Sequence, residues 1–337
     1  MGPDDLTMIA DGLERILIDA PLESIDRARG VGPEADALWT TLTEAGFAKL
    51  CAAEAHGGFG GSFADAGALA QLTARHACAL PLVDTILANG ILSATDVEAP
   101  AVRIALEDPL NIDSPLAHGG QSDAVLQMRD GRLMLRELSQ ATIAPLDNAE
   151  DRAAYLVGEL GEVLEEAVAP NWLTPDVYQV IGAFSRAAQM AGAMESVLTM
   201  TLSYTQEREQ FGRPLSKFQA IQHHLSDIAC ETAASIAAVE MARDAITSDA
   251  EFGPAILDEI AIAKVRCGEA ASKIAAAAHQ AHGAMGFTRE YALGRYTRRL
   301  WQWQDEFGAD VEWATRLGNA VFADANPSLW PRISQTL

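Results

Sequence analysis

The chain has 337 residues and a formal net charge of −23, from 47 acidic residues against 24 lysines and arginines. This length is enough to bury a stable core without disulfides or structural metals. The composition, 49% hydrophobic and 21% charged, excludes a disordered chain. The acidic excess argues against a nucleic-acid partner or a basic membrane-binding patch, because long-range attraction to phosphate has the wrong sign.

The sequence predicts a reduced, cytoplasmic protein. Its cysteines are scattered with no C-x-x-C pair, so we expect core thiols rather than a disulfide framework. They are Cys51, Cys78, Cys230 and Cys267. The sequence contains no run of 18 apolar residues, so we expect no membrane-spanning helix. Asp4, Asp5 and Glu14 occupy the region where a signal peptide would be basic, so we do not expect export.

Residues 1–99 predict an N-terminal helical domain. Apolar residues such as Leu38 and Leu42 recur at helical spacing, and an alanine-rich run follows from Phe63 to Cys78. The glycine cluster at residues 57–61 lacks the GK[ST] ending of a phosphate-binding loop and the third glycine of G-x-G-x-x-G. We therefore interpret this cluster as a turn.

Residues 100–170 predict a small middle domain with few strands. The apolar runs 124–128 and 133–135 flank Asp130-Gly131, a pair that favours a type I′ hairpin turn. Two or three strands alone are marginally stable in water, so this region must pack against its neighbours.

Residues 171–337 predict a C-terminal four-helix bundle. Thr174, Pro175 and Asp176 supply an N-cap, a first-turn proline and an acid facing the helix dipole. We expect helices near 175–209, 216–249, 255–282 and 290–305, and a shorter one near 310–324, separated by glycine and proline breaks. The predicted fold class is mainly α with a small β insert.

The histidines do not predict a metal site. His223 and His224 are adjacent on a helix and point about 100° apart, and no further ligand follows at a suitable spacing. His279 and His282 share a helix face, but at a C-terminus they more commonly complement the helix dipole. Nucleophile motifs such as G-x-S-x-G are absent as well.

Two C-terminal stretches interrupt the apolar helical pattern with polar residues and glycines. The first runs from Arg208 to Gln219 and places arginine beside a Gly-x-Pro helix break, which suits a pyrophosphate. The second runs from Gln280 to Tyr291, and its Gly-x-x-Gly turn lets a ligand approach the backbone closely.

These two stretches resemble the bundle motifs of the acyl-CoA dehydrogenase superfamily. The matching residues are Tyr204-x-x-x-Arg208-x-Gln-Phe-Gly-x-Pro-Leu-x-x-Phe-Gln219 and Gln280-x-x-Gly-x-x-Gly-Phe-Thr-x-Glu-Tyr291. The resemblance implies the family's order of a helical region, a β region and a four-helix bundle. It also implies FAD as cofactor, an acyl-CoA substrate, a carboxylate base for the α-proton, and an electron-transferring flavoprotein as acceptor.

The resemblance further implies which residues contact the cofactor. In the family, the two motifs reach across a subunit interface to the adenosine and pyrophosphate of a neighbour's FAD. By position, this role falls on Arg208, Gln210, Phe211, Gln219, Gln280, Gly283, Ala284 and Gly286. Ala284 replaces a usual glycine, which is a mild change unless the position needs a positive φ.

Departures from the family pattern predict a specialised role. The family's catalytic carboxylate would fall at Phe307 or Gly308, or at Gly182 in the first bundle helix, and none of these is acidic. Asp305 and Glu306 are the acids nearby. The middle region also lacks the K-x-W-[IV]-[TS] segment that packs on the flavin. We therefore predict no catalytic residue in this chain.

A chain of this kind resembles the shorter subunit of the heteromeric α2β2 acyl-CoA dehydrogenases of bacterial steroid side-chain degradation. We expect a larger subunit to supply the base and the flavin platform, while this chain supplies the adenine and pyrophosphate side. Two alternatives remain open. One is a self-sufficient homomeric enzyme that uses Glu306 as a displaced base, and the other is a flavin-free scaffold.

Overall fold

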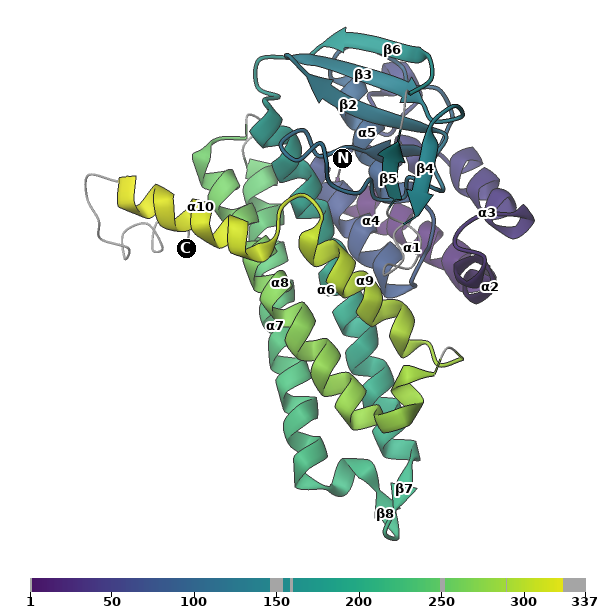
Figure 1. The fold of residues 1–337 in the computed structure, drawn as a ribbon, viewed down its shortest axis with the longest axis vertical. Coiled ribbons are helices and arrows are strands. Elements are labelled where there is room, and N and C mark those ends of the chain that lie inside the picture. The colour runs from purple at the N-terminus through teal and green to yellow at the C-terminus, as the bar shows by residue number, and fades with distance from the viewer. Residues whose placement is uncertain (1, 146–153, 158–159, 249–251, 289, 324–337) are drawn as a thin grey trace.

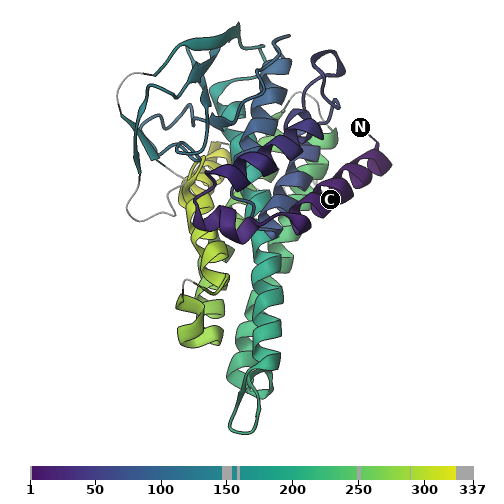
Figure 2. The ribbon, with the colours of Figure 1, turned by 90° about the vertical axis from the view of Figure 1, so that its right-hand side faces the viewer.

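The computed structural model describes residues 2–145, 154–157, 160–248, 252–288 and 290–323. The small sheet and the N-terminal helices lie together at one end of the molecule (Figure 1). The long bundle helices run from there to a short hairpin at the opposite end (Figures 1 and 2). The fold is mainly α with a small β insert, as the sequence predicts.

The N-terminal region consists of short helices packed on the upper half of the bundle. They are α1 (Pro3–Asp19), α2 (Leu22–Arg27), α3 (Pro33–Glu44), the 3-10 turns η1 (Phe47–Lys49) and η2 (Glu54–His56), α4 (Phe63–Arg75) and α5 (Leu82–Ser93). Ser62 and Asp65 form a reciprocal capping box that starts α4. Gly57 has a φ of +71° and closes η2, so the glycine cluster is the predicted turn.

The middle region contains more strands than the two or three expected. β1 (Ile104–Leu106), β2 (Ala124–Arg129), β3 (Arg132–Glu137) and β6 (Val163–Val168) form a sheet in the order β1-β2-β3-β6, while β4 (Thr142–Pro145) and β5 (Ala154–Val157) pair separately. The predicted hairpin is confirmed, since Asp130 and Gly131 have φ values of +49° and +72°. The Tyr178 hydroxyl donates to the Leu126 carbonyl at 2.9 Å and ties the sheet to the bundle.

The bundle is built from α6 (Pro175–Glu207), α7 (Gln219–Ser248), α8 (Pro254–His282) and α9 (Leu293–Asp305), followed by α10 (Asp310–Ala323). Thr174 caps α6 by accepting from the Val177 amide at 3.2 Å. The helices α7 and α9 begin three residues later than expected, because 3-10 and irregular turns precede them. Residue 324, the expected last residue of α10, lies outside the described residues.

The fold bears on the expectations for membrane-spanning helices and for the cysteines. Within the described residues, no helix has the length and apolar character needed to cross a membrane. The four cysteines are free, but only Cys78 and Cys267 are buried core thiols. The expectation is wrong for Cys230, which lies exposed on the outer side of α7, and Cys51 is only half-buried.

Candidate functional site

The first motif forms the end of the bundle farthest from the sheet, residues 208–219, which we call the bundle tip. The strands β7 (Glu209–Gln210) and β8 (Arg213–Pro214) flank Phe211 and Gly212, whose φ values are +51° and +77°. Two consecutive positive φ values define a type I′ turn. This turn leaves the Phe211 side chain 92% exposed, with its ring edge-on to Phe218.

The other predicted residues of this motif lie around the same hairpin. Arg208 caps the end of α6, and its carbonyl accepts from the Leu215 amide at 2.9 Å, which closes the tip. Gln210 lies on β7 and Gln219 begins α7, and both are exposed. The bundle tip therefore presents Arg208, Gln210, Phe211 and Gln219 together on its surface.

The second motif forms a 3-10 turn, η4 (Gly283–Phe287), which we call the closing turn. Gly283 has a φ of +58° and ψ of −141°, a conformation that strongly favours glycine. A Cβ on Gly286 would lie 3.0 Å from the His282 Cβ, so a larger residue at this buried position would crowd His282. Ala284 has no positive φ, so its replacement of the usual glycine leaves the turn unstrained. Gln280, Gly283 and Ala284 are exposed.

Aromatic contacts hold the two motifs together. The ring of Tyr204, in the last turn of α6, stacks on His282 with centroids 4.4 Å apart, and Tyr291 packs edge-on against it. His282 Nδ1 donates to the Ala278 carbonyl at 2.8 Å, so its Nε2 accepts from the Tyr291 hydroxyl at 3.1 Å. This cluster joins the last turn of α6 to the start of the closing turn.

The interpretation of His279 and His282 as complements of the helix C-terminus fits His282, whose Nδ1 donates to the Ala278 carbonyl in the last turn of α8. His279 Nε2 instead pairs with the Thr297 hydroxyl at 3.0 Å. Burial lowers the pKa of both imidazoles, which favours their neutral forms. His279 stacks on Phe287 with centroids 4.5 Å apart, so its role is packing. Among the residues that the structure describes, no group of histidines, cysteines and carboxylates could hold a metal ion.

The bundle tip also carries three basic side chains, Arg208, Arg213 and Lys217. Within the described residues, no ion pair engages the Arg208 guanidinium or the Lys217 ammonium. The Arg213 guanidinium instead lies 4.2 Å from the centre of the Phe218 ring. In a chain with 47 acidic residues, such a group of unneutralised cations indicates a place for an anion.

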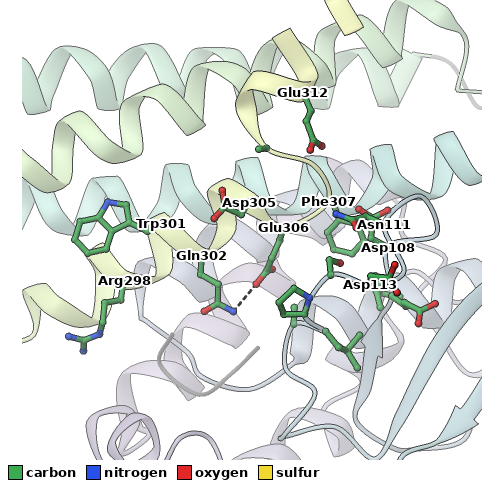
Figure 3. Close-up of a pocket in the computed structure, with 17 residues that line it drawn as sticks. Asp108, Asn111, Asp113, Arg298, Trp301, Gln302, Asp305, Glu306, Phe307 and Glu312 are labelled. Carbon is green, nitrogen blue, oxygen red and sulfur yellow. Dashed lines mark hydrogen bonds between the residues drawn. The ribbon is translucent and has the colours of Figure 1, made fainter. Parts of the chain in front are cut away.

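A separate cavity of about 650 Å³ lies far from the bundle tip, where the loop after β1 faces the end of α9 and the start of α10 (Figure 3). We call it the acidic pocket. Six carboxylates line it, and among the described lining residues the one basic side chain is Arg298. The carboxylates are Glu107, Asp108, Asp113, Asp305, Glu306 and Glu312.

The electrostatics of the acidic pocket disfavour further negative charge. Burial raises the pKa of Asp108, although two hydrogen bonds from Gln179, at 2.9 and 3.1 Å, oppose this shift. Burial also raises the pKa of Asp305, and Asp310, Glu306 and Glu312 add to the effect while Lys264 opposes it. These carboxyls resist ionisation because burial and repulsion both penalise the charged form.

Glu306 is held in a buried ionic network. Arg186 of α6 is fully buried and donates through Nε to one Glu306 oxygen and through its terminal nitrogens to Asp84, at 2.7 and 3.1 Å. Gln302 donates to the second Glu306 oxygen at 2.7 Å, as Figure 3 shows. Burial alone would lower the pKa of Arg186, but Asp84 and Glu306 raise it above its usual value, so the guanidinium stays charged.

The positions expected for a family base converge on one place. Gly182 of α6 and Phe307, in the turn between α9 and α10, are in contact: a Cβ on Gly182 would lie only 2.5 Å from two atoms of the Phe307 ring. The two positions are 125 residues apart in the sequence, yet the same aromatic ring occupies the space between them. The sequence shows that neither position carries a carboxylate, but it does not predict that the two positions are in contact.

The buried network and most of the acidic pocket cannot be recognised from adjacent residues alone. Asp84 and Arg186 each interrupt a strongly apolar helical run, Leu82–Leu92 and Val177–Met194, and a charge in such a run is a usable signal of a buried partner. Glu107, Asp108 and Asp113 lie in a loop without any periodic pattern. Only the tertiary structure brings that loop to α9.

The model of the acyl-CoA dehydrogenase C-terminal domain matches residues 181–301. Acyl-CoA dehydrogenase IpdE2 of Mycobacterium tuberculosis is 30% identical over 272 residues, which cover 78% of this chain and 80% of that protein. This chain belongs to the acyl-CoA dehydrogenase family. Its relatives are oxidoreductases that act on CH–CH groups, and the predicted resemblance to the superfamily is confirmed.

Solved structures show the same fold over nearly the whole chain. One is the ChsE4-ChsE5 complex from Mycobacterium tuberculosis, with a TM-score of 0.82 at 17% identity, covering 97% of this chain and 99% of that one. Another is a variant of the Tcur3481-Tcur3483 steroid acyl-CoA dehydrogenase, with a TM-score of 0.76 at 22% identity, covering 95% and 98%. At these identities the likeness supports the fold alone.

Proposed function

We propose that this family member is the shorter, non-catalytic subunit of a heteromeric acyl-CoA dehydrogenase. Its bundle tip and closing turn contact the adenine and pyrophosphate of an FAD whose flavin lies on a larger subunit. One contrast carries the proposal: within the described part of the chain no ion pair engages Arg208 or Lys217 at the bundle tip, while the Phe307 ring occupies the place expected for the base. Cofactor-binding and catalytic features are thus separated in this chain.

The bundle tip and the closing turn suit the half of FAD that carries phosphate. FAD supplies the acceptor for hydride when it is bound. Arg208 offers a guanidinium for a charge-assisted bond to phosphate, and the exposed Phe211 ring offers a face to a base. The side-chain amides of Gln210, Gln219 and Gln280 add donors and acceptors, while Gly283, Ala284 and Gly286 let a ligand reach the backbone.

The acidic pocket argues against catalysis by this chain alone. Both FAD and CoA are polyanions, and six carboxylates line the pocket beside Phe307, a position that the resemblance gives to the catalytic base. Glu306, the displaced base of the homomeric alternative, has one oxygen bonded to Arg186 and the other to Gln302. Both oxygens of the proposed base therefore already accept hydrogen bonds from side chains of this chain.

The proposed assembly is an α2β2 tetramer with a larger acyl-CoA dehydrogenase subunit. Two of the solved structures with this fold are named as pairs of different chains, and one of these is named as a steroid enzyme. We accordingly propose a cytoplasmic enzyme that desaturates a steroid-type acyl-CoA and passes electrons to an electron-transferring flavoprotein. Within this chain, the proposed regions are residues 1–99, 100–170 and 171–337, and the last carries the contacts to FAD.

Purification of the chain alone and together with a larger homologue tests the proposal. We expect a colourless protein alone, and a yellow α2β2 complex by absorption spectroscopy and native mass spectrometry when the two are co-expressed. A chain that is yellow and active alone, and inactive as Glu306→Gln, would instead establish the homomeric enzyme. Colourless assemblies in both cases would leave the flavin-free scaffold.

A further inference from the structure

The wall of the acidic pocket nearest to α6 is a single aromatic side chain held in an unfavourable backbone conformation. Phe307 has a φ of +55°, a region that bulky residues rarely adopt. Such a conformation persists only where the surrounding contacts impose it. The ring is 4% exposed, although the residue lines a pocket of about 650 Å³.

Contacts from three directions fix Phe307. The Arg186 guanidinium lies 5.2 Å from its centre, in the range of a cation–π contact. The Trp313 indole N–H donates to the Phe307 carbonyl at 2.9 Å, and the next residue, Gly308, has a φ of +89° that only glycine adopts easily. On the side of α6, Gly182 supplies the space for the ring.

Gly182 and Phe307 are therefore matched in size. Any side chain at position 182 would overlap the ring, and the ring fills the volume that a larger residue on α6 would occupy. Trp301, the other aromatic residue of the pocket, lies farther back along α9 and is 44% exposed (Figure 3). The lining thus includes one half-exposed and one buried aromatic ring, Trp301 and Phe307.

We propose that Phe307 is a plug that bars acyl thioesters from this chain's own pocket. Its ring occupies the space against Gly182, and none of the described residues of α6 lines the pocket, so an apolar chain has no path between α6 and the α9–α10 turn. This inference deepens the proposed function. It rests on that proposal in one respect, namely that an acyl group would bind in this pocket. The Phe307 ring thus gives a steric reason why this chain would be inactive by itself, and introducing a carboxylate nearby would not remove it.

The binding of an uncharged thioester by the full-length chain tests the plug. The probe is S-octanoyl-N-acetylcysteamine, which lacks the phosphates that the pocket carboxylates would repel, and the measurement is isothermal titration calorimetry. In Phe307→Gly the ring is gone and the positive φ becomes unstrained, so affinity should rise at least about 10-fold over wild type. The matched control Phe322→Ala removes a ring that is 87% exposed on α10 and does not line the pocket, so it should change affinity by less than about 3-fold.

Equal affinities of wild type and Phe307→Gly for the probe would overturn the proposal. A second measurement reads the contact without any ligand. Gly182→Ala should lower the midpoint of thermal unfolding by about 3 °C or more in the wild-type chain, and should leave it unchanged or raised in the Phe307→Gly background, where alanine favours the helix. The same loss in both backgrounds would also overturn it. Neither result depends on FAD retention, so the proposed function stands or falls separately.

Discussion

The buried arginine at the centre of the chain gives the sharpest prediction about stability. Replacing Arg186 by methionine removes a fully buried guanidinium and leaves the Asp84 carboxylate, 1% exposed, without its cation. Removing one partner of a buried ion pair costs about 3–5 kcal/mol, because the remaining charge stays desolvated. Arg186 also contacts Glu306 and the Phe307 ring, so the expected loss lies at the upper end of that range.

Urea-induced unfolding measures this loss, with Arg75→Met as the matched control. Arg75 likewise pairs across two helices, with Glu195 at 2.9 Å, but both side chains are partly exposed, at 40% and 30%. Its loss should cost about 1 kcal/mol or less. Adding Asp84→Leu to Arg186→Met should restore much of the stability, because no unpaired charge then remains at position 84. Equal losses for Arg186→Met and Arg75→Met would refute the reasoning.

Three further predictions concern a buried amine, the closing turn and the bundle tip. Burial lowers the pKa of Lys264 to about 7, whereas an unfolded lysine keeps its proton up to about pH 10.4. Between these values the free energy of unfolding, compared with that of Lys264→Met, should therefore rise by up to about 1.4 kcal/mol per pH unit. Urea unfolding at about pH 7 and about pH 9 measures this difference, and a difference that does not change between the two would contradict the prediction. Gly283→Ala should destabilise by about 1 kcal/mol or more because of its positive φ, whereas Ala284→Gly should cost less, and thermal unfolding compares the two. Phe211→Ala should leave the unfolding free energy within about 0.5 kcal/mol of wild type but lower the FAD retained by the complex, and unchanged FAD absorbance would refute its contact with the cofactor.

Local signals explain what the sequence could predict. Thr174 and Pro175 start α6 and Asp130-Gly131 turns the hairpin, because each depends on the chemistry of a few adjacent residues. The bundle motifs could be recognised because they are contiguous. Even so, the structure was needed to show that Tyr204 packs on His282 and joins them.

Features that depend on distant contacts could not be predicted. Arg186 meets residues 102 positions before it and 120 positions after it, and nothing in the local sequence specifies either partner. The sequence shows that Phe307 is not acidic, but not that its ring lies against Gly182. The additional strands beyond the predicted hairpin were likewise missed, since β1 is three residues long and β6 carries two glutamates.

The central claim is that this chain supplies the cation for the phosphates of an FAD shared with a larger subunit. The most direct test is the FAD dissociation constant of the co-purified complex with Arg208→Ala, against Arg15→Ala, which removes an equal charge from an exposed position on α1. Losing a charge-assisted phosphate contact should cost about 1.5–3 kcal/mol, or about 10- to 150-fold in affinity. We expect that weakening for Arg208→Ala alone, with thermal stability unchanged. Equal FAD affinity in both variants would contradict the claim.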